Sequence, residues 1–296
     1  MVAPDLPLRL GKDLVIDRLT GDEVTRCRQA GLFRPMLAQW HSSVIDDEQA
    51  VGFRWTTSLE KRVLRGDEPP QPPESADEGR FCDRPLPRLD LTLDDVLSAL
   101  RLLKPGVVSA AGAASWADSP WVRGTSFHLR GDSRHFGEYE LSKEEARDLQ
   151  QLWGLLEKLE KGSPLSFSIH RFNQAFERGL RVDRIVDLVI SAESLFLGDI
   201  QDRGELSFRL ALRAAKFIVD PKYCEQEIYK RMKEAYDARS AIVHGRRTTD
   251  SKLPDINKLE DLVRLGLRKA LSFDDPKRLK EPQYWESLIL SGSNPP

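Results

Sequence analysis

Apolar residues recur every three or four positions through most of the second half of the chain, which is the spacing of one face of an α-helix. The clearest helical stretch is 142–161, whose apolar face consists of Leu149, Leu152, Leu156 and Leu159. Ser142 and Glu145 have the spacing of a capping box at its start, and Gly162 marks its end. Further helices with short connections are predicted near residues 166–178, 181–198, 204–219, 223–244, 254–273 and 282–290. This half of the chain is therefore predicted to form a helical bundle.

The first part of the chain shows shorter and more varied patterns. Residues 8–19 favour a short strand or hairpin, and residues 51–57 combine β-branched and aromatic side chains as a strand does. Between them, Thr20 and Glu23 have a second capping-box spacing, which predicts a helix over 20–30. This region is therefore predicted to mix strands and helices.

A proline-rich, acidic segment follows at 66–90 and is predicted to be a loop or an exposed linker, because proline interrupts helices and central strands. Residues 91–103 then favour a helix with Thr92 as its N-cap. Residues 105–138 are rich in Gly, Ala, Ser and Trp, and we expect short strands there.

These patterns predict an α+β protein with a mixed α/β domain over 1–162 and an all-helical domain over 163–296. The 296 residues suffice for two hydrophobic cores, and 40% hydrophobic with 31% charged residues is typical of a soluble globular protein. No run of 18 or more apolar residues could span a bilayer. The three cysteines are far apart, and no histidine or cysteine pair has metal-ligand spacing. We expect a cytoplasmic protein with no membrane association, no metal and no cofactor.

Charge is distributed unevenly along the chain. Residues 161–296 carry 24 Lys+Arg against 20 Asp+Glu, whereas residues 1–160 carry 21 against 27. The C-terminal half is therefore the better candidate for contact with a polyanion such as RNA. An ordinary solvated surface with this balance is the alternative interpretation.

Arg239 occupies a position where the helical pattern favours an apolar residue. On the predicted helix 223–244, its neighbours three and four residues away include Ala235, Ile242 and Val243. An arginine there needs a carboxylate partner, an interface or a cleft.

Glu193 is the corresponding anomaly on the predicted helix 181–198. It lies off the polar stripe of that helix, among Val189, Ile190, Phe196 and Leu197. We expect Glu193 to be buried and paired with an arginine, for which Arg239, Arg209 and Arg213 are the candidates. A purely structural salt bridge between packed helices is the alternative.

His244 ends the helix that carries Arg239, and Gly245 follows as a suitable residue for the C-terminal cap. Ser240 and Asp237 precede the histidine by one and two turns on roughly the same face. Arg239 and His244 are five residues apart, so their side chains diverge by about 140° on a regular helix. Favourable interaction with the helix dipole is the alternative to a catalytic role for this histidine.

Three stretches together resemble the HEPN superfamily, in particular the ApeA-type HEPN domains of bacterial phage-defence proteins. They are RVDRIVDLVISAESLFLG (181–198), ELSFRLALRAAKFI (205–218) and YDARSAIVHG (236–245). The last stretch contains an arginine and a histidine separated by four residues, Arg239 and His244. The resemblance covers roughly residues 164–290.

The resemblance implies a dimeric, metal-independent endoribonuclease of the phage-defence or toxin kind, with Arg239 and His244 as the catalytic pair. Ser240, Glu193 and Asp237 would support this pair. Histidine would transfer protons while the 2′-OH of RNA attacks the adjacent phosphate, and arginine would stabilise the developing charge. Ser240 departs from the family, whose active members often carry Asn, Asp or His there. One alternative is a non-catalytic HEPN module for dimerisation or nucleic-acid binding, and another is a helical scaffold.

Two groups of arginines are candidates for holding RNA phosphates: Arg246 and Arg247 directly after the motif, and Arg209 and Arg213 on one helix face. A solvated face or internal ion pairs are the alternative for the second group. Arg246 also replaces the tyrosine found in HEPN toxins that a partner nucleotidyltransferase silences, so we do not expect that control. By analogy with defence proteins, the N-terminal domain would sense a phage or cellular trigger.

Overall fold

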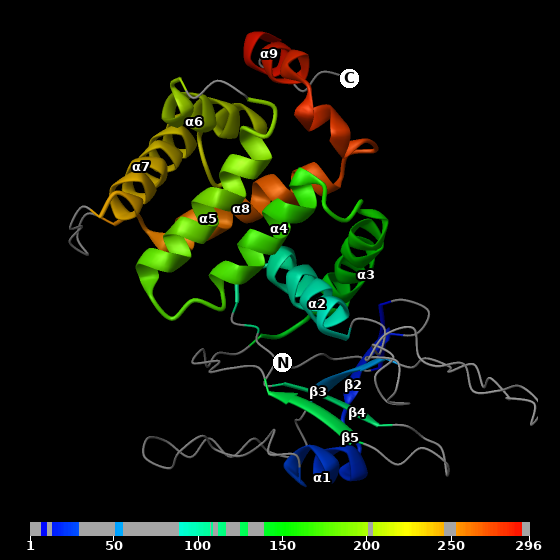
Figure 1. Ribbon diagram of the computed structural model, residues 1–296. Coiled ribbons are helices and arrows are strands. Elements are labelled where there is room, and N and C mark those ends of the chain that lie inside the picture. Colours follow the sequence, from blue (N-terminus) through cyan, green and yellow to red (C-terminus); the bar gives the residue numbers. More distant parts are fainter. Residues whose placement is uncertain are drawn as a thin grey trace, which may run out of the picture. The chain divides into compact units, whose positions relative to one another are not determined.

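The chain divides into two compact units (Figure 1). The structure is a computed structural model that describes residues 7–10, 14–29, 51–55, 89–106, 108, 112–116, 125–129, 139–200, 204–245 and 253–291. One unit comprises residues 1–96, 110–132 and 140–146, and the other comprises 97–109, 133–139 and 147–296. The second unit thus includes residues that precede the expected boundary at 163. The predicted proline-rich loop at 66–90 lies almost wholly outside the described residues.

Two small antiparallel sheets lie in the first unit, where the sequence predicts strands. The strands are β1 (Leu8–Arg9), β2 (Leu14–Arg18), β3 (Val51–Trp55), β4 (Gly112–Trp116) and β5 (Thr125–Leu129). One sheet has the order β1-β2-β3, and β4 pairs with β5 in the other. Ile16 lies opposite Leu8 and Phe53 in the first sheet and is fully buried. The alternation along β2 therefore turns one of its faces inward.

Two predicted helix starts can be compared with helices α1 (Gly21–Gln29) and α2 (Leu89–Leu103). At α1 the capping box is confirmed, because the N–H of Thr20 donates to Glu23 at 2.8 Å and the N–H of Glu23 donates to the Thr20 hydroxyl at 3.3 Å. At α2 the prediction is wrong, since the helix begins before Thr92. The helix starts three residues before Thr92, so Thr92 lies inside its first turn.

From Lys143 onward the described chain is almost entirely helical, close to the predicted ranges. The helices are α3 (Lys143–Lys158), α4 (Pro164–Ala175), α5 (Arg181–Phe196), α6 (Leu206–Phe217), α7 (Glu225–Val243), α8 (Ile256–Leu271) and α9 (Pro282–Ser291), with a short 3-10 helix at Pro276–Lys280. In the described part of the chain, no helix is both long and apolar enough to cross a membrane.

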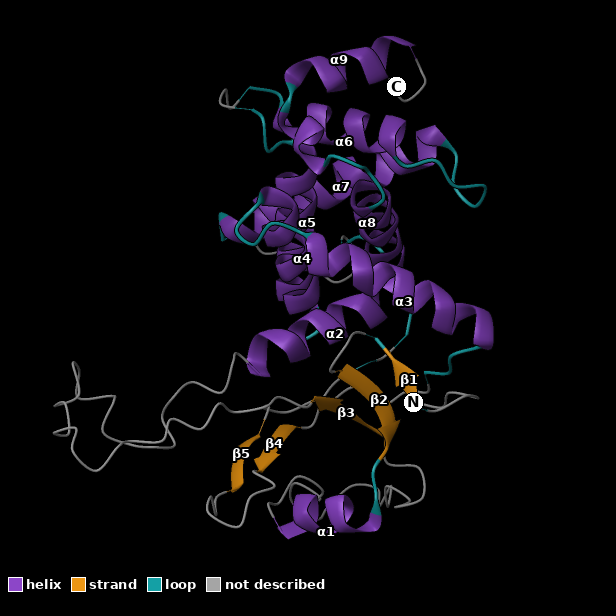
Figure 2. Cartoon of the chain, turned by 90° about the vertical axis from the view of Figure 1, so that its right-hand side faces the viewer, coloured by secondary structure: helices purple, strands orange, loops and turns teal. Residues whose placement is uncertain are grey.

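Helix α5 lies at the centre of the helical unit and contacts α4, α6, α7 and α8 (Figures 1 and 2). Helices α6 and α7 pack against each other on one side of it, and α4 lies on the other. Gly266 lets α8 approach α5 closely, since a methyl group there would come within 3.1 Å of Phe196 and 3.2 Å of Leu195. The central position of α5 explains why this helix is apolar on most of its sides.

A buried polar contact joins α4 to α5. The Ser168 hydroxyl donates to the carbonyl oxygen of Ser191 at 2.5 Å, and the Ser191 hydroxyl donates to that of Ser168 at 2.8 Å. Asp187, one turn earlier on α5, is also buried and accepts a hydrogen bond from Arg178 at 2.6 Å. Asp187 and Ser191 of this polar stripe thus find polar partners on α4 and in the turn that follows it.

Candidate functional site

Helix α7 presents Arg239 on the face that packs into the bundle. The buried side chains of this helix are Ile228, Met232, Ala235 and Ala238. Arg239 continues their face one turn beyond Ala235. The helix then ends at His244, where Gly245 adopts a φ of +67°, as expected of a capping glycine. Arg239 therefore lies one turn from the end of α7, at the edge of the core.

Arg239 meets Glu193 across the contact between α7 and α5. Its Nη2 atom lies 3.6 Å from Oε2 of Glu193, and the two side chains are 28% and 22% exposed. The predicted pairing of Glu193 with an arginine is confirmed, and Arg239 is the partner. Glu193 is only partly buried, because the pair lies near the end of α7 and stays partly open to solvent.

Arg239 differs from the arginines that hold the bundle together. Arg213 donates to both carboxylate oxygens of Asp199, at 2.5 and 3.0 Å, and Arg264 donates to the carbonyl oxygen of Arg101 at 2.8 Å. Within the described part of the chain, Arg239 has only the 3.6 Å ion pair, and its buried Nε atom has no partner. Its guanidinium group therefore keeps donors available for an oxyanion.

The electrostatics of this contact involve a third residue, Tyr236. Burial raises the pKa of Glu193, and the positive charge of Arg239 only partly offsets that effect. Burial also raises the pKa of Tyr236, with a further contribution from the charge of Glu193. Tyr236 is not among the site residues predicted from the sequence. Its position three residues before Arg239 is the signal that indicates a place in this cluster.

His244 lies apart from this cluster, exposed at the C-terminal end of α7. Its backbone N–H donates to the carbonyl oxygen of Ser240 at 3.1 Å. Asp237, which the sequence grouped with these residues, instead accepts a hydrogen bond from Ser207 of α6 at 3.1 Å. Among the described residues, no hydrogen bond or ion pair joins His244 to Arg239. The structure thus brings Arg239 to Glu193, while His244 faces solvent.

The candidate RNA-binding arginines of α6 differ in their surroundings. Arg213 is only 8% exposed, pairs with Asp199 and stacks on Trp285 at 4.9 Å, so it holds the core together and is not available to a phosphate. The alternative interpretation, an internal ion pair, therefore holds for Arg213. Arg209 is half-buried and forms no ion pair with any described residue. Arg246 and Arg247 lie outside the described residues.

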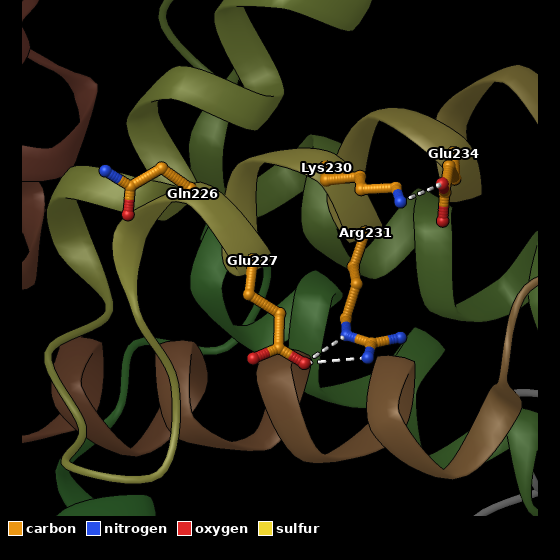
Figure 3. Close-up of a pocket in the computed structure, with 5 residues that line it drawn as sticks. All are labelled: Gln226, Glu227, Lys230, Arg231 and Glu234. Atoms are coloured by element: carbon orange, nitrogen blue, oxygen red, sulfur yellow. Dashed lines mark hydrogen bonds and ion pairs between the residues drawn. The ribbon is translucent and has the colours of Figure 1, made fainter.

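A shallow depression along α7 is lined by Gln226, Glu227, Lys230, Arg231 and Glu234 (Figure 3). Arg231 donates two hydrogen bonds to Glu227, at 2.9 and 2.7 Å, and Lys230 lies 4.0 Å from Glu234. These charges therefore satisfy one another. The depression lies on α7 before Arg239 and includes none of the predicted site residues.

No protein-family model, no curated protein and no solved structure matches this chain. In the part of the chain that the structure describes, no group of three or more His, Cys, Asp or Glu side chains is placed to hold a metal ion. Function is therefore inferred from the chemistry of Arg239, Glu193, Tyr236 and His244.

Proposed function

We propose that the helical unit is a HEPN-type domain and that the chain is a metal-independent endoribonuclease of the phage-defence or toxin kind. The state of Arg239 carries this proposal. A partly buried guanidinium without hydrogen bonds among the described residues is unfavourable in a purely structural role. Arg239 is suited instead to bind an oxyanion from outside the domain, such as an RNA phosphate. The first unit would then receive the phage or cellular trigger.

In the proposed reaction, the ribose 2′-oxygen attacks the adjacent phosphorus, and the bond from phosphorus to the 5′-oxygen of the next nucleotide breaks. The products are a 2′,3′-cyclic phosphate and a 5′-hydroxyl. His244 takes the proton from the 2′-hydroxyl or gives one to the leaving 5′-oxygen. Arg239 stabilises the negative charge that develops on the phosphorane oxygens.

A second copy of the chain would complete this site, because Arg239 and His244 of one chain face different directions. Apolar side chains near the pair are partly open to solvent: Val243 is 56% exposed, and Ile242 is half-buried. On α5, the face of Glu193 continues through three half-buried residues, Val182, Val186 and Ile190. Such a surface suits a two-fold contact that would place two Arg–His pairs in one cleft.

Glu193 favours a second candidate function, a HEPN-type module that dimerises or binds RNA without cutting it. Its carboxylate neutralises part of the charge on Arg239. Ser240 also supplies no strong acid or base beside the arginine, where active members of the family often carry Asn, Asp or His. In this case the protein would bind RNA through Arg239 but would not cleave it, and His244 would have no catalytic role.

Incubating the purified protein with total RNA in the presence of EDTA tests the nuclease. We expect cleavage that yields 5′-hydroxyl ends and that His244→Ala abolishes. The matched control is His170→Ala, which removes an exposed histidine of α4 and should leave cleavage unchanged. Equal cleavage by wild type and His244→Ala would contradict the catalytic role. Arg239-dependent binding of RNA without any cleavage would support the non-catalytic module.

A further inference from the structure

Glu193 is the counter-ion of the arginine to which the proposed function assigns phosphate binding. We infer that Glu193 is a positioning residue for Arg239, and that an RNA phosphate bound there replaces the carboxylate as counter-ion while Glu193 takes up a proton. This inference rests on the proposed function, because it requires Arg239 to bind RNA. According to this inference, RNA binding depends on pH because of the contact between Glu193 of α5 and Arg239 of α7.

The geometry of the pair allows this exchange. At 3.6 Å, the contact between Arg239 and Glu193 is longer than a hydrogen bond. The carboxylate therefore orients the guanidinium by charge without occupying its donors. With 28% of the Arg239 side chain exposed, a phosphate can approach from the solvent side and accept two parallel hydrogen bonds.

The charges around α5 leave Glu193 dependent on Arg239. Ion pairs that do not include Glu193 join α5 and the turn after it to the neighbouring segments. They are Arg171–Asp187, Arg178–Asp187, Arg213–Asp199 and Arg184–Glu260. Among the described residues, the interactions of Glu193 are with Arg239 and Tyr236 of α7. Once a phosphate binds Arg239, burial still disfavours the ionised carboxylate of Glu193. Most of the positive charge of Arg239, which had offset this effect, is then neutralised by the phosphate.

The consequence is that RNA binding and protonation of Glu193 favour each other. Burial already raises the pKa of Glu193, and a bound anion raises it further. Between the pKa of the free protein and that of the complex, affinity therefore increases as pH falls, by at most about tenfold per pH unit for one proton. Tyr236 stays neutral in this range, because its pKa is raised above 10.0.

Fluorescence anisotropy with a 2′-O-methyl oligoribonucleotide, which lacks the attacking hydroxyl, tests the inference. Affinity is measured between about pH 5 and pH 8 in a His244→Ala background, so that the imidazole makes no contribution to binding. With Glu193 present, we expect binding to tighten as pH falls. Glu193→Gln should bind about tenfold more tightly at the upper end of the range and lose most of the pH dependence.

Companion variants separate positioning from charge. Glu193→Ala removes the charge but also the group that orients Arg239, so it should bind more weakly than Glu193→Gln at every pH. Glu193→Asp keeps a carboxylate and should retain the pH dependence. Glu234→Gln, which alters an exposed carboxylate of α7 that pairs with Lys230 at 4.0 Å, should leave the pH dependence unchanged.

The outcomes distinguish this inference from the proposed function. If Arg239→Ala abolishes binding but Glu193→Gln matches wild type in affinity and pH dependence, the inference is overturned and the proposed function stands. If Arg239→Ala binds as tightly as wild type, both are overturned.

Discussion

Arg209 and Arg213 lie one turn apart on α6, yet only Arg213 is part of the core. Its partner Asp199 is 2% exposed, so removal of the arginine would leave a buried carboxylate without its counter-ion. We expect Arg213→Ala to lower the free energy of unfolding by about 3–5 kcal/mol. Arg209→Ala should change it by less than about 0.5 kcal/mol. Urea unfolding of both variants measures the difference, and equal losses would contradict the structural role of Arg213.

The free energy of unfolding should depend on pH through Glu193, in the direction set by the burial of its carboxyl group. The pKa of folded Glu193 lies above its ordinary value of 4.5, so the folded protein binds this proton more tightly than the unfolded chain does. The contribution of Glu193 to stability is thus fully present below 4.5 and is lost as pH rises through the raised pKa. Glu193→Gln cannot ionise, so its stability relative to wild type should rise over the same window.

Thermal melts of wild type and Glu193→Gln across that pH range provide the measurement. A decline of the variant relative to wild type with rising pH would mean that attraction to Arg239 outweighs the cost of burial. In a fully buried ion pair, Glu193→Ala would lower the free energy of unfolding by about 3–5 kcal/mol. At 22% exposure and without a hydrogen bond, we expect about 1 kcal/mol.

The sequence could predict that Glu193 and Arg239 need partners, because helical periodicity alone places both among apolar neighbours. It could not predict how much solvent reaches them, since that depends on where α7 ends relative to α5. The place of Tyr236 beside Glu193 also depends on the contact between these two helices. Local periodicity gives directions around a helix axis, whereas burial is decided by the neighbouring elements.

Helix boundaries were predictable wherever a cap is encoded locally. Ser142 and Glu145 form the expected reciprocal bonds at the start of α3, at 2.9 and 3.2 Å. The contact of Ser168 with Ser191 could not be predicted, because it needs the partner helix to be known. Thr92 is a case in which the local signal misleads, because this suitable capping residue lies inside a helix that begins earlier.

Asp255 caps α8, which packs against α4, α5 and α7, so its loss should affect the whole helical unit. Its carboxylate accepts from the N–H groups of Asn257 at 3.1 Å and Lys258 at 3.4 Å. We expect Asp255→Ala to lower the free energy of unfolding by about 1 kcal/mol. Asp274→Ala, at an exposed position that caps no described helix, is the matched control and should melt like wild type. Identical melting of the two variants would show that the cap contributes nothing.

At the scale of the whole molecule, the extent of the helical unit depends on contacts between segments that lie far apart in the sequence. That unit includes residues 97–109, where Arg101 is 1% exposed and donates to Glu177 at 2.7 Å and to the carbonyl oxygen of Asn173 at 3.1 Å. These contacts span more than 70 residues of sequence. Periodicity within one segment cannot reveal them, so the sequence pattern alone could not define the limits of this unit.

The proposed nuclease depends on assembly, because one chain separates Arg239 from His244. Val243 lies between them in sequence and is 56% exposed, so a two-fold contact near Arg239 would bury it. We expect a mass of about 67 kDa by light scattering, twice the 33.6 kDa of one chain. Val243→Asp should reduce this mass to that of one chain and abolish RNA cleavage without lowering the melting temperature.

The matched control for this prediction is Leu290→Asp, because Leu290 is 86% exposed but lies on α9, which packs against α6. It places the same charge on an exposed apolar position away from the end of α7, so both mass and cleavage should stay unchanged. A wild-type mass near 34 kDa that does not rise when RNA is added would contradict the shared site. Cleavage by a monomeric Val243→Asp variant would show instead that a single chain brings His244 to a phosphate held by Arg239.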